Sequence, residues 1–287
     1  MEKWTTVIKP RTGLFDVNFK EIWQYKDLWS LFVKRDIVTQ YKQTILGPTW
    51  FVIQPIMTTV MFMVVFGRIA QISTDGLPQP LFYLAGICLW QYFSECLNKT
   101  SDTFVANAGI FGKVYFPRLV MPLATVTSNL VRFFIQLGLF VIVYLYYVIF
   151  TDAQVFVTAY ALLFPLLILI LAGLALGFGI LFSALTTKYR DLTKLLGFVV
   201  QLWMYATPII YPISMIAAIN ATAAKVMLLN PVAQVIQDVR FSFVTRQTDT
   251  VWSMSGNSVV IRSLKTNHGL ANPTLAFTTG TIFEAEI

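Results

Sequence analysis

The chain has 287 residues, of which 56% are hydrophobic and only 12% are charged, and its mean hydropathy is +0.67. Soluble domains carry about 25% charged residues, so this composition excludes an ordinary soluble domain and predicts a polytopic membrane protein. The net charge of +7 does not indicate nucleic-acid binding, because the cations lie between apolar runs and form no continuous basic stripe.

A basic amphipathic helix is expected over residues 33–46. At about 100° per residue, apolar side chains share one face and polar side chains share the other. The apolar face comprises Val33, Ile37, Val38, Tyr41 and Ile45, and the polar face comprises Arg35, Asp36, Thr39, Lys42 and Gln43. Gly47 and Pro48 break this helix, and residues 43–67 carry no charge. The pattern predicts a helix in the headgroup layer that leads directly into a membrane span.

Further apolar runs predict an all-α fold with five recognisable transmembrane helices. The expected spans cover residues 48–66, 81–97, 123–150, 153–187 and 195–224. Pro55 is expected to kink the first span, and Pro208 and Pro212 are expected to break the fifth, leaving short helices on the outer side. In the fourth span, Gly173, Ala175 and Gly177 place small residues at helix-packing spacing, and the two glycines form a GxxxG pattern, which marks internal packing more often than a defined dimer face.

The distribution of cations predicts the orientation. Fourteen Lys and Arg residues fall in residues 1–47, 98–121 and 187–194, whereas the outer gaps hold Arg68, Lys225 and Arg240. Because cytoplasmic segments carry an excess of Lys and Arg, the amino terminus is expected in the cytoplasm.

The last part of the chain does not continue this pattern. Five spans leave the chain outside, and residues 246–287 contain no apolar run long enough for a sixth. The predicted domains are therefore a cytoplasmic amino-terminal segment over residues 1–47, a transmembrane domain over residues 48–245 and an atypical tail over residues 246–287. The polar composition of this tail indicates residues that are out of frame or disordered.

The residues do not indicate a catalytic or metal centre. No GxxxxGK[ST] phosphate loop is present, so ATP-driven work would require a partner chain, and no cofactor is expected on this one. Cys88 and Cys96 are interpreted as packing residues. Glu95 allows two interpretations: a functional ionisable group within a span, or the partner of Lys99 one helical turn away near the interface.

Several stretches resemble the membrane (permease) subunit of bacterial ABC exporters of lipid-linked polysaccharide, of the O-antigen, capsule or teichoic acid type. They are YKQTILGPTWFVIQP (41–55), VFGRIA (65–70), KVYFPRLVMPL (113–123), KYRDLTKLLGFVVQLWMYATPIIYP (188–212) and LNPVAQVIQDVRFSFV (229–244). The resemblance implies a subunit of the bacterial cytoplasmic membrane with six spans, which dimerises around a central path and binds a separate ABC ATPase. The sixth span is not recognisable here. The alternatives are an exporter of a drug or small lipid with the same fold, and a membrane-embedded glycosyltransferase.

In that family, the amino-terminal amphipathic helix and the connection between the second and third spans contact the ATPase. These segments correspond to residues 29–46 and 104–118 of this sequence. The residues expected to couple to the ATPase are Arg35, Lys42, Lys113, Tyr115, Phe116, Pro117 and Arg118.

A path for a polysaccharide requires aromatic faces and hydrogen-bonding groups, because sugars present both CH faces and hydroxyls. The candidate path residues are Trp50, Phe62, Phe66, Glu95, Trp203, Tyr205 and Tyr211. The alternative is that these aromatic side chains face lipid or anchor the spans at the interface.

Overall fold

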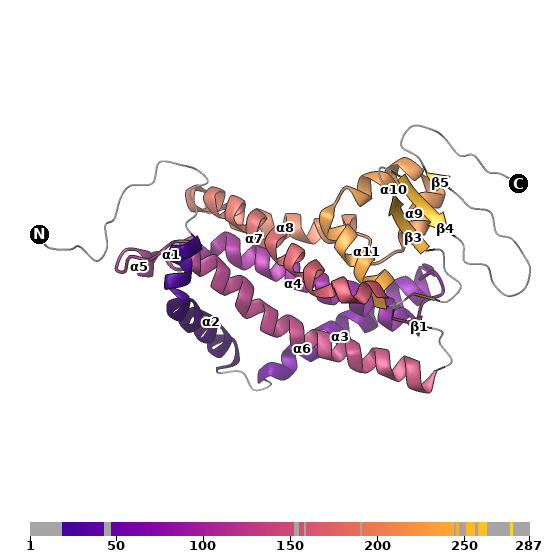
Figure 1. Ribbon diagram of the computed structural model, residues 1–287, viewed down its shortest axis with the longest axis horizontal. Coiled ribbons are helices and arrows are strands. Elements are labelled where there is room, and N and C mark those ends of the chain that lie inside the picture. The colour runs from indigo at the N-terminus through magenta and orange to yellow at the C-terminus, as the bar shows by residue number, and fades with distance from the viewer. Residues whose placement is uncertain are drawn as a thin grey trace, which may run out of the picture.

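The computed structural model describes residues 19–42, 47–151, 155–157, 159–189, 191–243, 245–246, 251–255, 258–262 and 276–277. Long helices lie side by side along the longest axis of the molecule (Figure 1). We call the end of the bundle that holds α1, α2 and α5 the basal end, and the end that holds α9 and α10 the distal end.

The basal end begins with α1 (Phe19–Gln24) and α2 (Lys26–Tyr41). The expected helix is therefore present but starts seven residues earlier than predicted. Of its predicted apolar face, Val33 packs against buried residues, Ile37 is half-buried and Val38 is 47% exposed. Ile22 and Phe32, which lie before the predicted range, are buried. Apolar residues from Ile22 to Val33 pack against the start of α6, and this contact, which local periodicity does not reveal, selects the buried face. Residues 43–46 and the side chain of Tyr41 lie outside the described residues.

The first span consists of a 3-10 turn (Gly47–Thr49), α3 (Trp50–Phe62) and a π-helix (Met63–Ile69). Gly47 has φ +50°, a left-handed conformation that glycine adopts without a steric penalty. The chain therefore turns at the predicted break. Pro55 lies inside α3, which continues through it.

The remaining long helices are α4 (Gln79–Ala106), α6 (Val120–Phe150), α7 (Phe164–Lys188) and α8 (Asp191–Ala206). Among the described residues, three helical segments are long and apolar enough to cross a membrane: Gly47–Ile69, Val120–Phe150 and Tyr160–Lys188. These segments confirm a polytopic helical membrane protein. The other two expected spans do not meet that measure, because α4 contains Gln91 and Glu95, and α8 ends after 16 residues.

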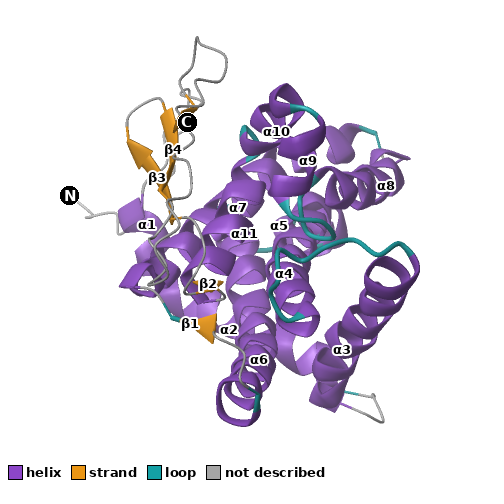
Figure 2. Ribbon diagram, turned by 90° about the vertical axis from the view of Figure 1, so that its right-hand side faces the viewer, coloured by secondary structure: helices purple, strands orange, loops and turns teal. Residues whose placement is uncertain are grey.

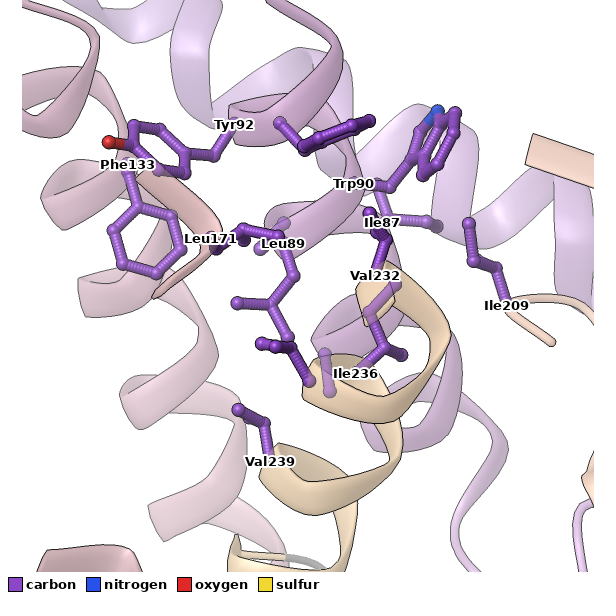
Figure 3. Packing of buried hydrophobic residues seen from close by; sticks show 14 of the residues in the cluster. Ile87, Leu89, Trp90, Tyr92, Phe133, Leu171, Ile209, Val232, Ile236 and Val239 are labelled. Carbon is purple, nitrogen blue, oxygen red and sulfur yellow. The ribbon is translucent and has the colours of Figure 1, made fainter. Parts of the chain in front are cut away.

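Helix α4 forms the centre of the bundle. All of its residues from Leu81 to Trp90 are buried, and it contacts α3, α6, α7, α8 and α11 (Pro231–Phe243). Figure 3 shows Ile87 of α4 near Val232 and Ile236 of α11. The stretch from Leu81 to Trp90 is apolar all round and is stabilised by burial on every side, which explains the central place of α4.

Small residues allow α4 and α7 to approach closely, but not at the predicted glycines. Nothing lies within 4 Å of a Cβ built at Gly173 or Gly177, whereas a Cβ at Gly179 would lie 2.6 Å from the Cβ of Thr100 on α4. Within this chain the close contact therefore lies at Gly179 and not at Gly173 or Gly177, whereas Ala175, which was also predicted to pack, is fully buried. The buried stripe of α7 instead runs through Leu171, Ala175, Gly179 and Ser183.

The fifth span breaks at Pro208 and Pro212, as the sequence predicts. Helix α8 ends at Ala206, and after residues 207–212 the chain forms α9 (Ile213–Ile219) and α10 (Ala221–Leu228). Asn220 caps α10 by accepting hydrogen bonds from the backbone N–H groups of Thr222 and Ala223. Short helices at the end of the fifth span are thus confirmed.

Short strands occupy part of the remaining chain. Strand β1 (Val155–Phe156) pairs with β2 (Thr245–Arg246), and β3 (Val251–Ser255), β4 (Ser258–Arg262) and β5 (Ala276–Phe277) form an antiparallel sheet (Figure 2). Most of the predicted tail over residues 246–287 lies outside the described residues. The proposed division into domains remains a prediction.

Candidate coupling surface and polar network

Two segments expected to contact an ATPase meet at the basal end. The ring of Phe32 on α2 lies 5.7 Å from the ring of Phe116, and Phe116 stacks at 5.3 Å on Phe111 of α5 (Ala108–Phe111). Phe116 is only 5% exposed. Phe116 belongs to a group of buried residues that we call the basal cluster: Ile22, Phe32, Phe116, Val120, Met121 and Ala124. The cluster joins α2 to the connection between α4 and α6.

Arg35 adds a polar link beside the basal cluster. Its guanidinium donates to the carboxylate of Asp36 at 2.8 Å and to the side-chain oxygen of Asn107 at 3.4 Å. It also lies 5.0 Å from the centre of the Phe32 ring. Arg35 therefore connects α2 to the end of α4 within the chain itself.

The other predicted coupling residues differ in exposure. Lys113 and Arg118 are exposed, Tyr115 is 54% exposed and its neighbour Val114 is 56% exposed, whereas Pro117 is half-buried. We call Lys113, Val114, Tyr115 and Arg118 the coupling surface. Lys42 is exposed just after α2. The structure thus separates a buried support, Phe116, from an exposed cationic and aromatic surface.

A second group of polar residues lies between α4 and α6, which run antiparallel. Gln136 donates to Gln91 at 2.8 Å, Arg132 pairs with Glu95 at 3.1 Å, and Lys99 donates to Asn129 at 3.1 Å. We call these three pairs the polar ladder. Its rungs are about one helical turn apart on each helix, because residues three or four positions apart share a face.

Glu95 is the centre of the ladder. Its carboxylate lies 3.2 Å from the amine of Lys99 as well as 3.1 Å from Arg132. Arg132 in turn donates to Gln54 of α3 at 2.8 Å, and its guanidinium lies 4.7 Å from the ring centre of Phe51. The pairing of Glu95 with Lys99 is therefore confirmed. One carboxylate faces two cations, so this group joins α3, α4 and α6 and keeps one net positive charge.

The sequence reasoning did not identify Arg132 or Gln54 as partners of Glu95. A signal was available, because a carboxylate inside an apolar run requires a counter-charge, and Arg132 occupies a comparable depth on the next span. Choosing Arg132 over other cations required knowing that α4 and α6 are neighbours.

The candidate path residues do not gather in one place. Trp203 packs against Trp90, Phe93 and Phe178 inside the bundle, with ring centres 5.3 to 6.4 Å apart. Phe62 is buried, with Phe66 at 5.4 Å.

Two other candidate path residues share a hydrogen bond at the break in the fifth span. The Tyr211 hydroxyl donates to the carbonyl of Tyr205 at 2.8 Å. Tyr205 and Trp50 are about half exposed, at 49% and 54%. The structure thus brings together Phe62 with Phe66 and Tyr205 with Tyr211, and leaves Trp50, Glu95 and Trp203 in separate surroundings.

A small apolar crevice between α4, α6, α7 and α11 includes none of these candidates. It is lined by Ala85, Cys88, Leu89, Phe133, Leu137, Phe140, Phe164, Val239 and Phe243. Cys88 and Cys96 are buried free thiols, in agreement with their interpretation as packing residues. Within the described residues, no group of three His, Cys, Asp or Glu side chains could hold a metal ion.

Comparisons with known proteins agree with this architecture. Residues 27–244 match the ABC-2 type transporter family. The O-antigen export system permease protein RfbA of Myxococcus xanthus is 26% identical over 226 residues, covering 78% of this chain and 83% of the relative. An RfbA protein of Klebsiella pneumoniae is 27% identical over 217 residues, covering 76% and 80%. The polysialic acid transport protein KpsM of Escherichia coli is 23% identical over 209 residues, covering 72% and 77%.

The family match begins within α2 and ends one residue after α11, so it takes in the helical bundle, the coupling surface and the polar ladder. It stops before the strands of the tail. The chain therefore belongs to the ABC-2 type transporter family, whose members are the membrane subunits of transporters.

Proposed function

We propose that this chain is the permease subunit of an ATP-driven ABC exporter that moves a lipid-linked polysaccharide across the bacterial cytoplasmic membrane. Three relatives carry names of O-antigen or polysialic acid transport proteins, which supports a polysaccharide as the cargo. The observation that carries the proposal is the meeting of α2 with the connection between α4 and α6 around Phe116.

In this proposal the basal end faces the cytoplasm, with the amino terminus on that side. A partner ATPase binds and hydrolyses ATP, because this chain contains no GxxxxGK[ST] phosphate loop. The partner docks on the coupling surface, where Lys113 and Arg118 supply positive charge and Tyr115 supplies a large exposed side chain. Arg35 and Lys42 contribute from α2.

The basal cluster transmits movement from the coupling surface into the bundle. Close-packed interiors have low compressibility, so a displacement of Tyr115 is passed to Phe116 and then to Phe32 and Met121. Phe116 and Pro117 thus act from below the docking surface rather than by direct contact.

The cargo crosses between two copies of the chain in this proposal. Trp50 and Tyr205, each about half exposed, contact sugar rings directly, and the half-buried Tyr211 is held beside them by its hydrogen bond to the Tyr205 carbonyl. Phe62, Phe66 and Trp203 support the path by packing, and Glu95 acts through its pairs with Arg132 and Lys99.

The domain boundaries belong to the same proposal. Residues 48–245 form the permease domain, preceded by the amino-terminal segment and followed in the sequence by the atypical tail over residues 246–287. The family match, which ends at residue 244, supports this boundary.

Deletion of the gene followed by analysis of surface glycans and cellular lipids tests the proposed cargo. We expect loss of one surface polysaccharide and accumulation of its lipid-linked form inside the cell. Intact glycans with altered resistance to a drug would favour the alternative cargo. Purification of the tagged chain should also recover an ABC ATPase, and recovery without one would contradict the proposed partnership.

A further inference from the structure

Arg240 is the only charged residue among the described side chains that is fully enclosed, at 3% exposed. The sequence places it among the cations of the outer gaps, but in the structure it lies on the buried face of α11. No carboxylate of the described residues lies within ion-pair distance of it. Its guanidinium donates instead to two consecutive backbone carbonyls, those of Pro208 at 2.5 Å and Ile209 at 2.6 Å.

These carbonyls need a donor because the fifth span breaks there. Helix α8 ends at Ala206, so these carbonyls have no continuing helix to supply donors; residue 212, which would donate to the Pro208 carbonyl in such a helix, is Pro212 and has no N–H group. A carbonyl buried without a hydrogen bond is unfavourable, especially at membrane depth. The planar guanidinium presents parallel N–H donors and can satisfy both carbonyls at once, which the single ammonium of a lysine does less well.

The surroundings of Arg240 are shaped to hold its charge. The guanidinium carbon lies 3.7 Å from the centre of the Phe82 ring, a cation–π arrangement that favours the charged form. A Cβ built at Gly86 would lie 2.5 Å from the Nη2 atom and 3.1 Å from Ile209. Helix α4 therefore leaves the space that the guanidinium occupies, and three elements meet at this one side chain.

The hydrogen bonds from Arg240 to Pro208 and Ile209 also restrain the short helices of the distal end, because these helices follow directly in the chain. Helix α9 begins at Ile213, only four residues after Ile209. At its start, the Ser214 hydroxyl donates to the carboxylate of Asp75 at 2.8 Å. The beginning of α9 is therefore restrained from two sides, by the loop of Asp75 and by the bonds of Arg240.

We propose that Arg240 is a positioning residue that fixes the break of the fifth span to α11, so that α11 and the start of α9 keep one relative placement at the distal end. This inference goes beyond the proposed function and depends only on the contacts of Arg240. It holds whichever cargo the chain transports.

Distance measurements between α9 and α11 test this proposal. Spin labels are attached to cysteines at Met215 and Asp238, both exposed, in the full chain with Cys88 and Cys96 replaced by alanine and reconstituted in nanodiscs. Arg240→Met keeps a long side chain without donors, and Arg240→Lys keeps the charge. We expect Arg240→Met to broaden the distance distribution about twofold, and Arg240→Lys to broaden it less.

A second variant displaces the guanidinium without altering it. Gly86→Ala places a methyl group against Nη2, whereas Gly138→Ala on α6 adds a methyl group with nothing within 4 Å. We expect Gly86→Ala to broaden the distribution and Gly138→Ala to retain the native width. Lys225→Gln, which removes an exposed cation of α10, should also retain it.

The proposal is overturned if Arg240→Met or Gly86→Ala retains the native width. A uniform loss of thermal stability without broadening would likewise assign Arg240 a purely packing role and overturn it. If Arg240→Met is not recovered from membranes, the comparison of Gly86→Ala with Gly138→Ala decides the outcome. The measurement needs neither substrate nor ATPase, so failure of the proposed function leaves its result unchanged.

Discussion

Glu95 of α4 and Arg132 of α6 form an ion pair of 3.1 Å, and Arg132 reaches onward to Gln54 of α3. Arg132 is mostly buried, with a side chain that is 13% exposed, whereas the side chain of Glu95 is 34% exposed. Such a pair stabilises the packing of three helices chiefly because either charge alone would lack compensation in an apolar setting.

Replacement of Arg132 by methionine tests this relationship. We expect the free energy of unfolding to fall by about 1 to 2 kcal/mol, less than for a fully buried pair because water screens Glu95. Thermal unfolding of the purified chain measures the change, with the exposed Lys194→Met as control. The double variant Glu95→Gln with Arg132→Met should recover part of the loss. Strictly additive losses would contradict an interaction between the two residues.

Phe116 and Tyr115 are adjacent in sequence but differ in burial, and so offer a matched pair. Phe116→Ala removes a buried ring from the basal cluster and should lower the free energy of unfolding by about 3 kcal/mol. Tyr115→Ala should change it by less than about 0.5 kcal/mol, because the side chain is exposed. Tyr115→Ala should nevertheless reduce copurification of the ATPase. Undiminished copurification would remove Tyr115 from the docking surface.

The break between α2 and the first span should be needed for coupling. Replacing Gly47 and Pro48 by alanine disfavours the left-handed backbone at residue 47, at a cost of about 1 to 2 kcal/mol, and favours a continuous helix. We expect the reconstituted complex to hydrolyse ATP while exporting little polymer. Met57→Ala, an exposed change in the same span, serves as control. Export at the unmodified rate would count against a role for this turn.

The close approach of α4 and α7 depends on Gly179. Gly179→Ala should lower the free energy of unfolding by about 1 to 3 kcal/mol, because the new methyl group would overlap Thr100. Gly173→Ala should be neutral or stabilising by about 0.5 kcal/mol, because its surroundings are open and alanine favours a helix. Thermal unfolding of both variants separates the two positions. Equal effects would contradict the packing register described for α7.

Several features of this protein follow from the sequence alone. The apolar runs predict membrane helices because the length needed to cross a bilayer is a property of each segment by itself. The break of the fifth span at Pro208 and the turn at Gly47 are also local, since they arise from backbone chemistry within a few residues. The resemblance of sequence stretches between residues 41 and 244 to ABC exporter permeases predicted the transporter family.

Only the tertiary structure decided how those helices use their side chains. The periodicity of α2 allowed more than one buried face, and contact with α6 selected the face of Phe32. Gly177 and Gly179 are equally small, and only the neighbouring Thr100 makes Gly179 the close contact. From the sequence, Arg240 is expected to be an exposed loop cation. It is buried instead, because it donates hydrogen bonds to the carbonyls of Pro208 and Ile209, which lack helical donors. Each of these outcomes depends on residues distant in the chain, whose proximity no local pattern contains.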